Sequence, residues 1–393
     1  MKKKKIGIVT HYYQSTNYGG NLQAYALCAV LLGRGYEAEQ ICFPLFERNF
    51  KYRFISKNRK ELLKSVSRKL KRVFLLPFRR KLLKEEREKF QQVYKEKKKA
   101  FYNFNLNLIP HNDKMYSNGT IGETIPIYDA FITGSDQVWN FLWYNPIFFL
   151  AFVPKSKLKI SYAASMAMDS LSKKQANLVK MHLESYKAVS VREKESIALL
   201  KDISPVEVKL VLDPTLLLSC DDWDQVCADR FIEDDYVFCY FLGSNPNERK
   251  IAEEFAKKRG LKLVAIPPIN ILSKTQDEHF GDMQLYDASP EQFLSLIKHA
   301  KYVFTDSFHA VVFSNIYQKQ YFVFNRSAKA EMSSRITDIT ALFHQEERFC
   351  TGKERESLTY VESLSNIDYT KENKDFEKLK KESIEFLENN LKD

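Results

Sequence analysis

Short apolar runs alternate with longer segments of helical periodicity along most of the chain. Residues 6–10 form the first apolar run, which is followed by a polar, glycine-bearing turn at residues 11–21 and a helical segment at residues 22–32. Further strands are expected at residues 37–43, 129–136, 159–165, 188–192, 208–213, 236–242, 261–266, 302–304 and 321–325. Strands that alternate with helices pair in parallel, so the pattern predicts an α/β fold.

A basic segment at about residues 44–110 interrupts the alternation of strands and helices, and the pattern begins again at residue 217. These two points indicate how the chain is divided into domains. A length of 393 residues is enough for two domains. We expect an N-terminal α/β domain at residues 1–216 with a basic helical insertion at about 44–110, and a C-terminal α/β domain at residues 217–345. A tail at residues 346–393 contains a helical segment that we expect to pack back on the first domain. Two Rossmann-like domains would then face each other across a central cleft.

The basic segment accounts for the net positive charge of the chain. Residues 51–100 contain 20 Lys/Arg and 5 Asp/Glu, so their net charge of +15 exceeds the +11 of the whole chain. Leu62, Val66, Leu70 and Phe74 recur every four residues and form an apolar stripe. The stripe either packs on the domain or lies on an anionic membrane surface, and both interpretations remain open. Because the rest of the chain is near neutral, we expect no nucleic acid as partner.

The composition indicates the cellular compartment and whether a metal site is expected. The six cysteines form no CxxC pair, and the seven histidines show no metal-ligand spacing, so we expect a reducing compartment and no metal. The apolar run after the N-terminal lysines is too short for a signal peptide, and no stretch approaches about 18 apolar residues. These observations predict a cytoplasmic protein.

Three reactive side chains lie where the strand at residues 302–304 meets an apolar helix. Asp306, Ser307 and His309 occupy this junction. In open α/β sheets, ligands bind beyond the carboxyl ends of strands, beside the N–H groups of the next helix. His309 is therefore a candidate general acid/base and Asp306 its candidate orienting group. The alternative is that Asp306 and Ser307 only cap the helix.

Other polar residues follow strands of the first domain. Ser135 and Asp136 end one strand, Arg192 ends another, and Asp213 ends a third. Arg192 either pairs with the acids that follow it or grips a phosphate or carboxylate. The two aspartates either accept sugar hydroxyls or cap turns. Several such placements along one sheet indicate a crevice.

Six short motifs in this order resemble those of the polysaccharide pyruvyl transferase family. They occur at residues 17–26, 131–139, 190–193, 211–215, 305–310 and 333–336. The resemblance implies a fold like that of the two-domain GT-B glycosyltransferases. It also implies transfer of the pyruvyl unit of phosphoenolpyruvate to two hydroxyls of a sugar, which forms a cyclic ketal in a cell-surface polysaccharide such as a capsule or exopolysaccharide.

The resemblance assigns roles to residues. His309 would transfer the proton, and Arg192 would bind the donor. The family commonly carries an arginine where this chain has Ser307. Arg335 or Arg326 would supply the missing contact to the anionic donor, and Ser307 would lie beside that donor. The predicted acceptor or cleft residues are Asn17, Gly20, Asn21, Ser135, Asp136 and Asp213.

The same resemblance implies which partners the protein has. They are phosphoenolpyruvate as co-substrate and a sugar acceptor linked to polyprenyl diphosphate, with no cofactor. Residues 51–100 would hold the enzyme at the inner face of the cell membrane. Two alternatives remain: a nucleotide-sugar glycosyltransferase of the same architecture, and a catalytically inactive glycan-binding subunit.

Overall fold

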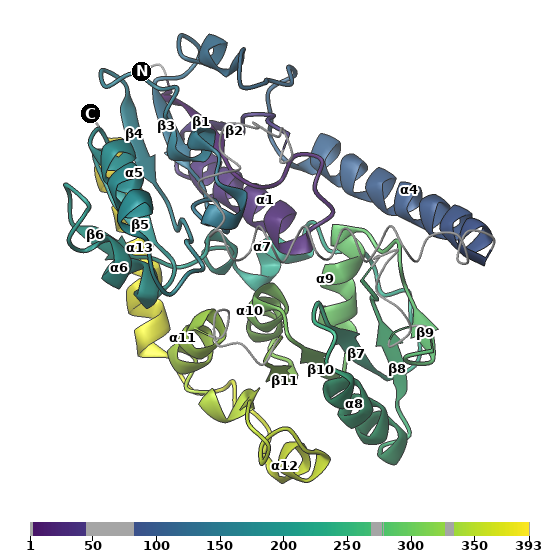
Figure 1. The fold of residues 1–393 in the computed structure, drawn as a ribbon. Helices are drawn as coiled ribbons and strands as arrows, with labels where there is room; N and C mark the ends of the chain where they lie inside the picture. Colours follow the sequence, from purple (N-terminus) through teal and green to yellow (C-terminus); the bar gives the residue numbers. More distant parts are fainter. Residues whose placement is uncertain (1–2, 45–81, 269–276, 278, 327–333, 393) are drawn as a thin grey trace.

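Two parallel sheets, one in each half of the chain, organise the computed structural model (Figure 1). The structure describes residues 3–44, 82–268, 277, 279–326 and 334–392. The predicted stripe at residues 62–74 and Ser333 therefore lie outside the described residues. Within the described residues, the α/β alternation and the parallel pairing predicted from the sequence are confirmed.

The first sheet has the strand order β2-β1-β3-β4, and the pair β5-β6 continues it through isolated bridges between residues 160 and 188 and between residues 164 and 191. Its strands are β1 (Lys5–Val9), β2 (Glu37–Gln40), β3 (Ala130–Thr133), β4 (Leu158–Ser161), β5 (Val189–Val191) and β6 (Val208–Leu210). The flanking helices are α1 (Tyr18–Gly33), α4 (Leu82–Leu108), α5 (Lys173–Leu183) and α6 (Lys194–Leu200). Because helices cover both faces, β3 is buried along its whole length.

The second sheet has the order β12-β11-β10-β7-β8-β9. Its strands are β7 (Tyr236–Tyr240), β8 (Lys262–Ala265), β9 (Met283–Gln284), β10 (Tyr302–Thr305), β11 (Gln320–Phe324) and β12 (Phe349–Cys350). The helices of this half are α7 (Cys220–Asp224), α8 (Pro246–Lys258), α9 (Pro290–His299), α10 (Phe308–Ile316), α11 (Ser334–Leu342) and α12 (Leu358–Ser363). Ser289 and Gln292 form a capping box at the start of α9.

Helix α1 begins earlier than the sequence pattern predicted. We expected a turn through residue 21, but α1 starts at Tyr18 because the Asn17 side chain accepts a hydrogen bond from the Gly20 N–H at 3.1 Å. The asparagine cap outweighs the low helix propensity of the two glycines at its start. The glycine-bearing segment thus presents a helix N-terminus to the second domain.

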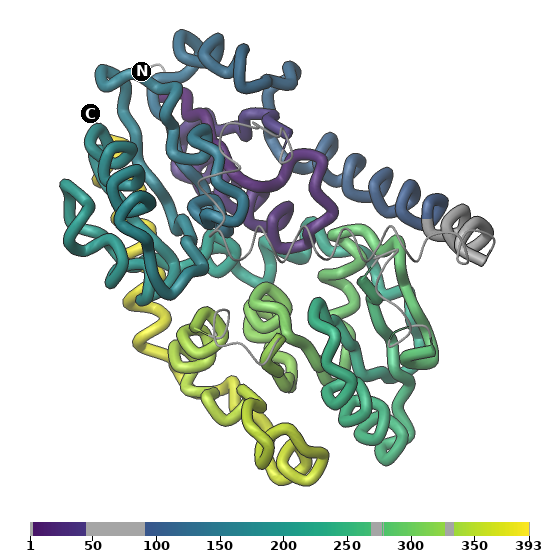
Figure 2. Tube along the Cα trace, viewed as in Figure 1, coloured from purple at the N-terminus to yellow at the C-terminus, as the bar shows by residue number. Residues whose placement is uncertain are grey.

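Two long helices connect the halves of the chain. Helix α13 (Lys374–Leu391) returns to the first domain, where Ser383 Oγ accepts a hydrogen bond from Leu212 N at 2.9 Å and Arg34 pairs with Glu388 at 2.6 Å. Helix α4 reaches from the first domain across to α9 (Figure 2). Phe101 and Phe104 of α4 are buried in the main core, so the C-terminal half of this basic helix is part of the fold. No helix of the described residues is long and apolar enough to cross a membrane.

Candidate functional site

The carboxyl ends of the two sheets border a common cavity of about 310 Å³. Arg192 and Asp213, which follow β5 and β6, line it from the first domain, while Phe308 and Arg335 line it from the second. Residues from two domains therefore meet at the place where open α/β sheets bind ligands. This cavity is the candidate functional site.

His309 is the second residue of α10, and its side chain lies between the domains. Only 7% of its surface is exposed. A Cβ atom at Gly19, near the start of α1, would lie 1.9 Å from His309 Nδ1. The imidazole therefore occupies space that exists because residue 19 has no side chain. Helix α10 begins beside this ring, and its free N–H groups favour an anion there.

Asp213 is the carboxylate closest to His309. Its Oδ2 lies 3.7 Å from His309 Nε2, which is too long for a direct hydrogen bond and leaves a charge contact. Ser135 Oγ donates to the same Oδ2 at 2.9 Å, and Thr215 donates to Oδ1 from its N–H and its hydroxyl at 3.1 and 2.7 Å. Burial alone would raise the pKa of Asp213, but His309, Arg192 and Thr215 hold that pKa well below its usual range. The carboxylate therefore stays ionised beside the imidazole.

Arg192 is committed to neighbouring acids. It donates to Asp213 at 2.7 Å and to Asp136 at 3.1 Å, and its Nε lies 3.8 Å from Glu193. Its guanidinium also lies over the Phe308 ring, 4.8 Å from the centroid. Burial opposes the charge, but the three acids raise the pKa of Arg192. The guanidinium thus already has acidic partners on both sides. Its predicted role in binding the donor substrate stays a prediction.

Arg335 has a different environment. It is 8% exposed, and its two terminal nitrogens face the Gln137 amide, whose oxygen accepts at 3.1 and 3.0 Å once the amide is turned to satisfy both partners. Burial, and then repulsion from Arg192, lower the pKa of Arg335 to about 10. Among the described residues, no carboxylate forms an ion pair with this guanidinium, and its Nε has no hydrogen-bond partner. A buried cation with only a neutral partner is suited to an anionic ligand.

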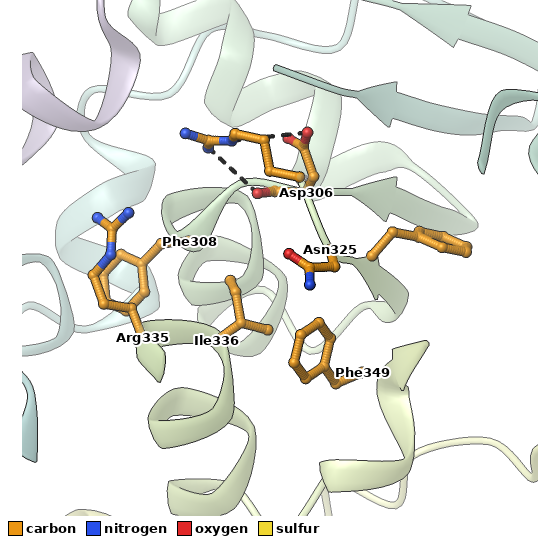
Figure 3. A pocket seen from close by; sticks show the side chains of 8 residues that line it. Asp306, Phe308, Asn325, Arg335, Ile336 and Phe349 are labelled. Carbon is orange, nitrogen blue, oxygen red and sulfur yellow. Dashed lines mark hydrogen bonds and ion pairs between the residues drawn. The ribbon is translucent and has the colours of Figure 1, made fainter. Parts of the chain in front are cut away.

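Asp306 serves the second domain rather than His309. Its two carboxylate oxygens accept hydrogen bonds from Leu242 N at 2.8 Å and Gly243 N at 2.6 Å, and Arg326 lies 3.8 Å away. Figure 3 shows Asp306 and Arg335 apart from each other in a pocket that both residues line. The structure therefore pairs His309 with Asp213, where the sequence suggested Asp306. Ser307 is the N-cap residue of α10, and its side chain makes no capping hydrogen bond.

The predicted acceptor residues separate into two groups. Asn17 caps α1, the Asn21 amide donates to Ser15 O at 3.2 Å and Asn17 O at 2.7 Å, and a Cβ at Gly20 would lie 2.6 Å from His11 O. Asn17, Gly20 and Asn21 thus shape the start of α1, which carries Gly19. Ser135 and Asp136 belong to the network around Asp213 and Arg192, and Asp136 has a left-handed φ of 72°.

Sequence reasoning missed three contributors to the site. Gly19 receives His309, Gln137 holds Arg335, and His11 lies buried near Asp136. Burial lowers the pKa of His11 to about 4, although Asp136 opposes this shift. Gly19 and Gln137 lie inside the motifs that carried the resemblance, but which group each one touches depends on the other domain. In the described part of the chain, no group of three or more His, Cys, Asp or Glu side chains could hold a metal ion.

Comparison with solved structures identifies the architecture. UDP-GlcNAc 2-epimerase from Methanocaldococcus jannaschii is 11% identical with a TM-score of 0.54, and the match covers 99% of this chain and 100% of that one. UDP-GlcNAc 2-epimerase from Neisseria meningitidis, bound to UDP-GlcNAc, is 10% identical with a TM-score of 0.53, covering 98% and 100%. At these identities the likeness shows the fold alone. It confirms the predicted GT-B-like pair of Rossmann-like domains.

Sequence comparison identifies the family. No curated protein matches the chain. A sequence profile described as polysaccharide pyruvyl transferase matches residues 17–327, which is most of the chain. The matched region contains His309, Asp213, Arg192 and Gly19, although Arg335 lies beyond its end. The chain therefore belongs to the polysaccharide pyruvyl transferase family.

Proposed function

We propose that the protein transfers the pyruvyl unit of phosphoenolpyruvate onto two hydroxyls of a sugar and releases phosphate, so that a cyclic pyruvate ketal forms. One observation carries the proposal. The buried imidazole of His309 lies 3.7 Å from the ionised carboxylate of Asp213, and Asp213 lines the same interdomain cavity as Arg335, a buried guanidinium whose partner is a neutral amide. The reaction requires a proton donor beside a binding site for a strongly anionic substrate.

The donor would bind at Arg335 and the N-terminus of α10. Phosphoenolpyruvate carries a phosphate and a carboxylate, and a guanidinium fork suits either group. The free N–H groups at the start of α10 favour the second anion. Arg192 lies nearby, but its contacts with Asp213 and Asp136 suit it to holding those carboxylates in place. In this proposal Arg335 takes the part that the resemblance assigned to the arginine missing at Ser307.

His309 would supply and recover the proton. Protonation of the methylene carbon turns it into a methyl group and leaves a cationic central carbon, which one sugar hydroxyl attacks. The carbon–oxygen bond to phosphate then breaks, and the second hydroxyl closes the ring. The two hydroxyls release two protons: one restores His309, and the other leaves with phosphate. Asp213 would stabilise the imidazolium before the first transfer, because its carboxylate remains ionised.

The acceptor is proposed to be a sugar linked to polyprenyl diphosphate, with residues 51–100 close to the inner membrane face. Residues 51–81 of that segment lie outside the described residues. Sedimentation with anionic vesicles tests this part separately. If the protein stays in the supernatant at low and at physiological salt, the membrane contact is wrong, but the transfer reaction is not affected.

Phosphate release from phosphoenolpyruvate tests the central proposal. We expect release that depends on acceptors containing galactose, glucose or N-acetylmannosamine, and a fall of about 10² to 10⁴-fold in His309→Ala. The matched control is His344→Ala, because the His344 side chain is 64% exposed and its ion-pair partner among the described residues is the exposed Asp375. It should retain full turnover.

The alternative of a nucleotide-sugar glycosyltransferase gives the opposite results. Specific binding of a nucleoside diphosphate, together with silence toward phosphoenolpyruvate across all acceptors, would overturn the proposal. Acceptor binding without turnover of either donor would instead favour a catalytically inactive glycan-binding subunit.

A further inference from the structure

A second and larger cavity lies on the first domain. Its volume is about 740 Å³, which is within the range of about 300–1,000 Å³ that ligand sites occupy. One wall is the loop at residues 12–16 that follows β1, and another is helix α4. The functional site described above does not use this cavity.

Aromatic and apolar side chains of α4 face the cavity at a helical spacing. Tyr94, Lys98, Tyr102 and Leu106 follow one another at intervals of four residues and all line it. Tyr94 is 39% exposed, Tyr102 is 58% exposed and Leu106 is 52% exposed. Such a row of exposed rings on one helix face is typical of a binding surface. Tyr13 adds a further ring from the opposite wall.

Polar groups among these rings fit a ligand rich in hydroxyls. Asn105 lines the cavity, is 7% exposed, and its Oδ1 has no hydrogen-bond partner in the described part of the chain. An unsatisfied buried amide costs free energy unless a ligand completes it. Among the described residues of the lining, Lys98 and Asp113 are the charged side chains, and their charges cancel. A near-neutral wall favours a neutral ligand over a diphosphate or an anionic lipid surface.

The cavity is connected to His309 by a short piece of chain. Thr16 lines the cavity, and Gly19 lies against the imidazole. The three residues from Thr16 to Gly19 span at most about 11 Å of extended chain. The cavity wall at Thr16 therefore lies within about 11 Å of Gly19, which contacts His309. A ligand held in the cavity by one end can therefore place its other end at the interdomain site.

We propose that this cavity binds the carbohydrate acceptor, as an oligosaccharide whose C–H ring faces stack on Tyr102 and Tyr94 while a hydroxyl donates to Asn105. The inference rests on the proposed function, because it names where the sugar that receives the pyruvyl unit is held.

Saccharide binding and turnover test the proposal separately. Saturation-transfer NMR with disaccharides ending in galactose, glucose or N-acetylmannosamine should detect binding to the unmodified protein. Tyr102→Ala and Tyr94→Ala should each weaken that binding by about tenfold, as the loss of one stacking ring predicts. In the phosphate-release assay the same variants should raise the KM for acceptor and leave the KM for phosphoenolpyruvate unchanged. Because both rings are partly exposed, neither change threatens folding.

Trp143→Ala is the matched control, since Trp143 is also 58% exposed but does not line the cavity. It should bind saccharides as the unmodified protein does. Binding that survives both tyrosine substitutions, or no binding of any disaccharide, overturns the inference. So does binding of UDP or of anionic vesicles that Tyr102→Ala abolishes. Loss of saccharide binding in the tyrosine variants without any turnover of phosphoenolpyruvate would uphold the cavity and reject the proposed donor.

Discussion

The contact between Gly19 and His309 predicts how a single methyl group affects activity. In Gly19→Ala the new Cβ would lie 1.9 Å from Nδ1, 2.4 Å from Cε1 and 2.5 Å from Cγ of the imidazole. Ordinary van der Waals contact begins near 3.4 Å, so the ring must move by about 1.5 Å. A displacement of about 1 Å in a reacting group can cost about a hundredfold in rate. We therefore expect kcat for phosphate release to fall by about a hundredfold.

The same change should leave the protein folded. Alanine improves helix propensity over glycine by about 1 kcal/mol, while overpacking costs about 1–3 kcal/mol. The net loss of about 2 kcal/mol at most is smaller than the total stability of about 5–15 kcal/mol expected of a folded protein. Circular dichroism and thermal melting should therefore show a folded variant with much reduced turnover.

Two further variants isolate the cause. Gly33→Ala changes the last residue of the same helix, where a Cβ meets nothing within 4 Å, and it should keep full activity. In the double variant with His309→Ala, Gly19→Ala should cause no further loss, because the clashing ring is gone. A kcat for Gly19→Ala within about threefold of the unmodified protein would refute the placement of His309 in the working enzyme.

Two other predictions follow from the charges around the cleft. Arg335→Gln should weaken phosphoenolpyruvate binding, measured by calorimetry, by about 10–100-fold without lowering the melting temperature, whereas the ion-paired Arg249→Gln should lose stability and keep its affinity. Unchanged affinity in Arg335→Gln would exclude Arg335 as the donor ligand. Burial lowers the pKa of both His11 and His182 to about 4, so between about pH 4 and 6.5 the unfolded chain binds protons that the folded chain does not. Stability measured by denaturation should therefore fall as pH drops through that window, and His11→Gln should flatten the slope by about 1.4 kcal/mol per pH unit; an unchanged slope would contradict the burial of a neutral His11.

The fold was readable from the sequence because buried parallel strands are almost continuously apolar. β7 is buried along its whole length, and its sequence contains no charged residue. The start of α1 was misread because two glycines suggest a turn, whereas the Asn17 side chain stabilises a helix there. The sequence shows that residue 17 is an asparagine, which is a common N-cap. Whether this cap outweighs the two glycines depends on how the start of α1 is buried against the second domain.

The candidate site was readable only in part. Strand ends identified Arg192, Asp213 and His309 as positions that open α/β sheets use for ligands. The partner of His309 could not be assigned from sequence proximity, because Asp306 is close in sequence but accepts hydrogen bonds from Leu242 and Gly243. Which carboxylate faces the imidazole is decided by the packing of one domain on the other, and no local pattern contains that information.

This division of the site between domains has a consequence for how it works. His309 comes from the second domain, but its carboxylate Asp213 and the space for its ring at Gly19 come from the first. The interface is also held elsewhere, since Tyr18 Oη donates to Ala288 O at 2.6 Å and Lys194 N donates to Asp338 at 3.0 Å. If the domains separated, the imidazole would lose both its neighbouring carboxylate and the wall that fixes its ring. In the proposed reaction, proton transfer would therefore require both domains together, because neither domain alone contains both the imidazole and its neighbouring carboxylate.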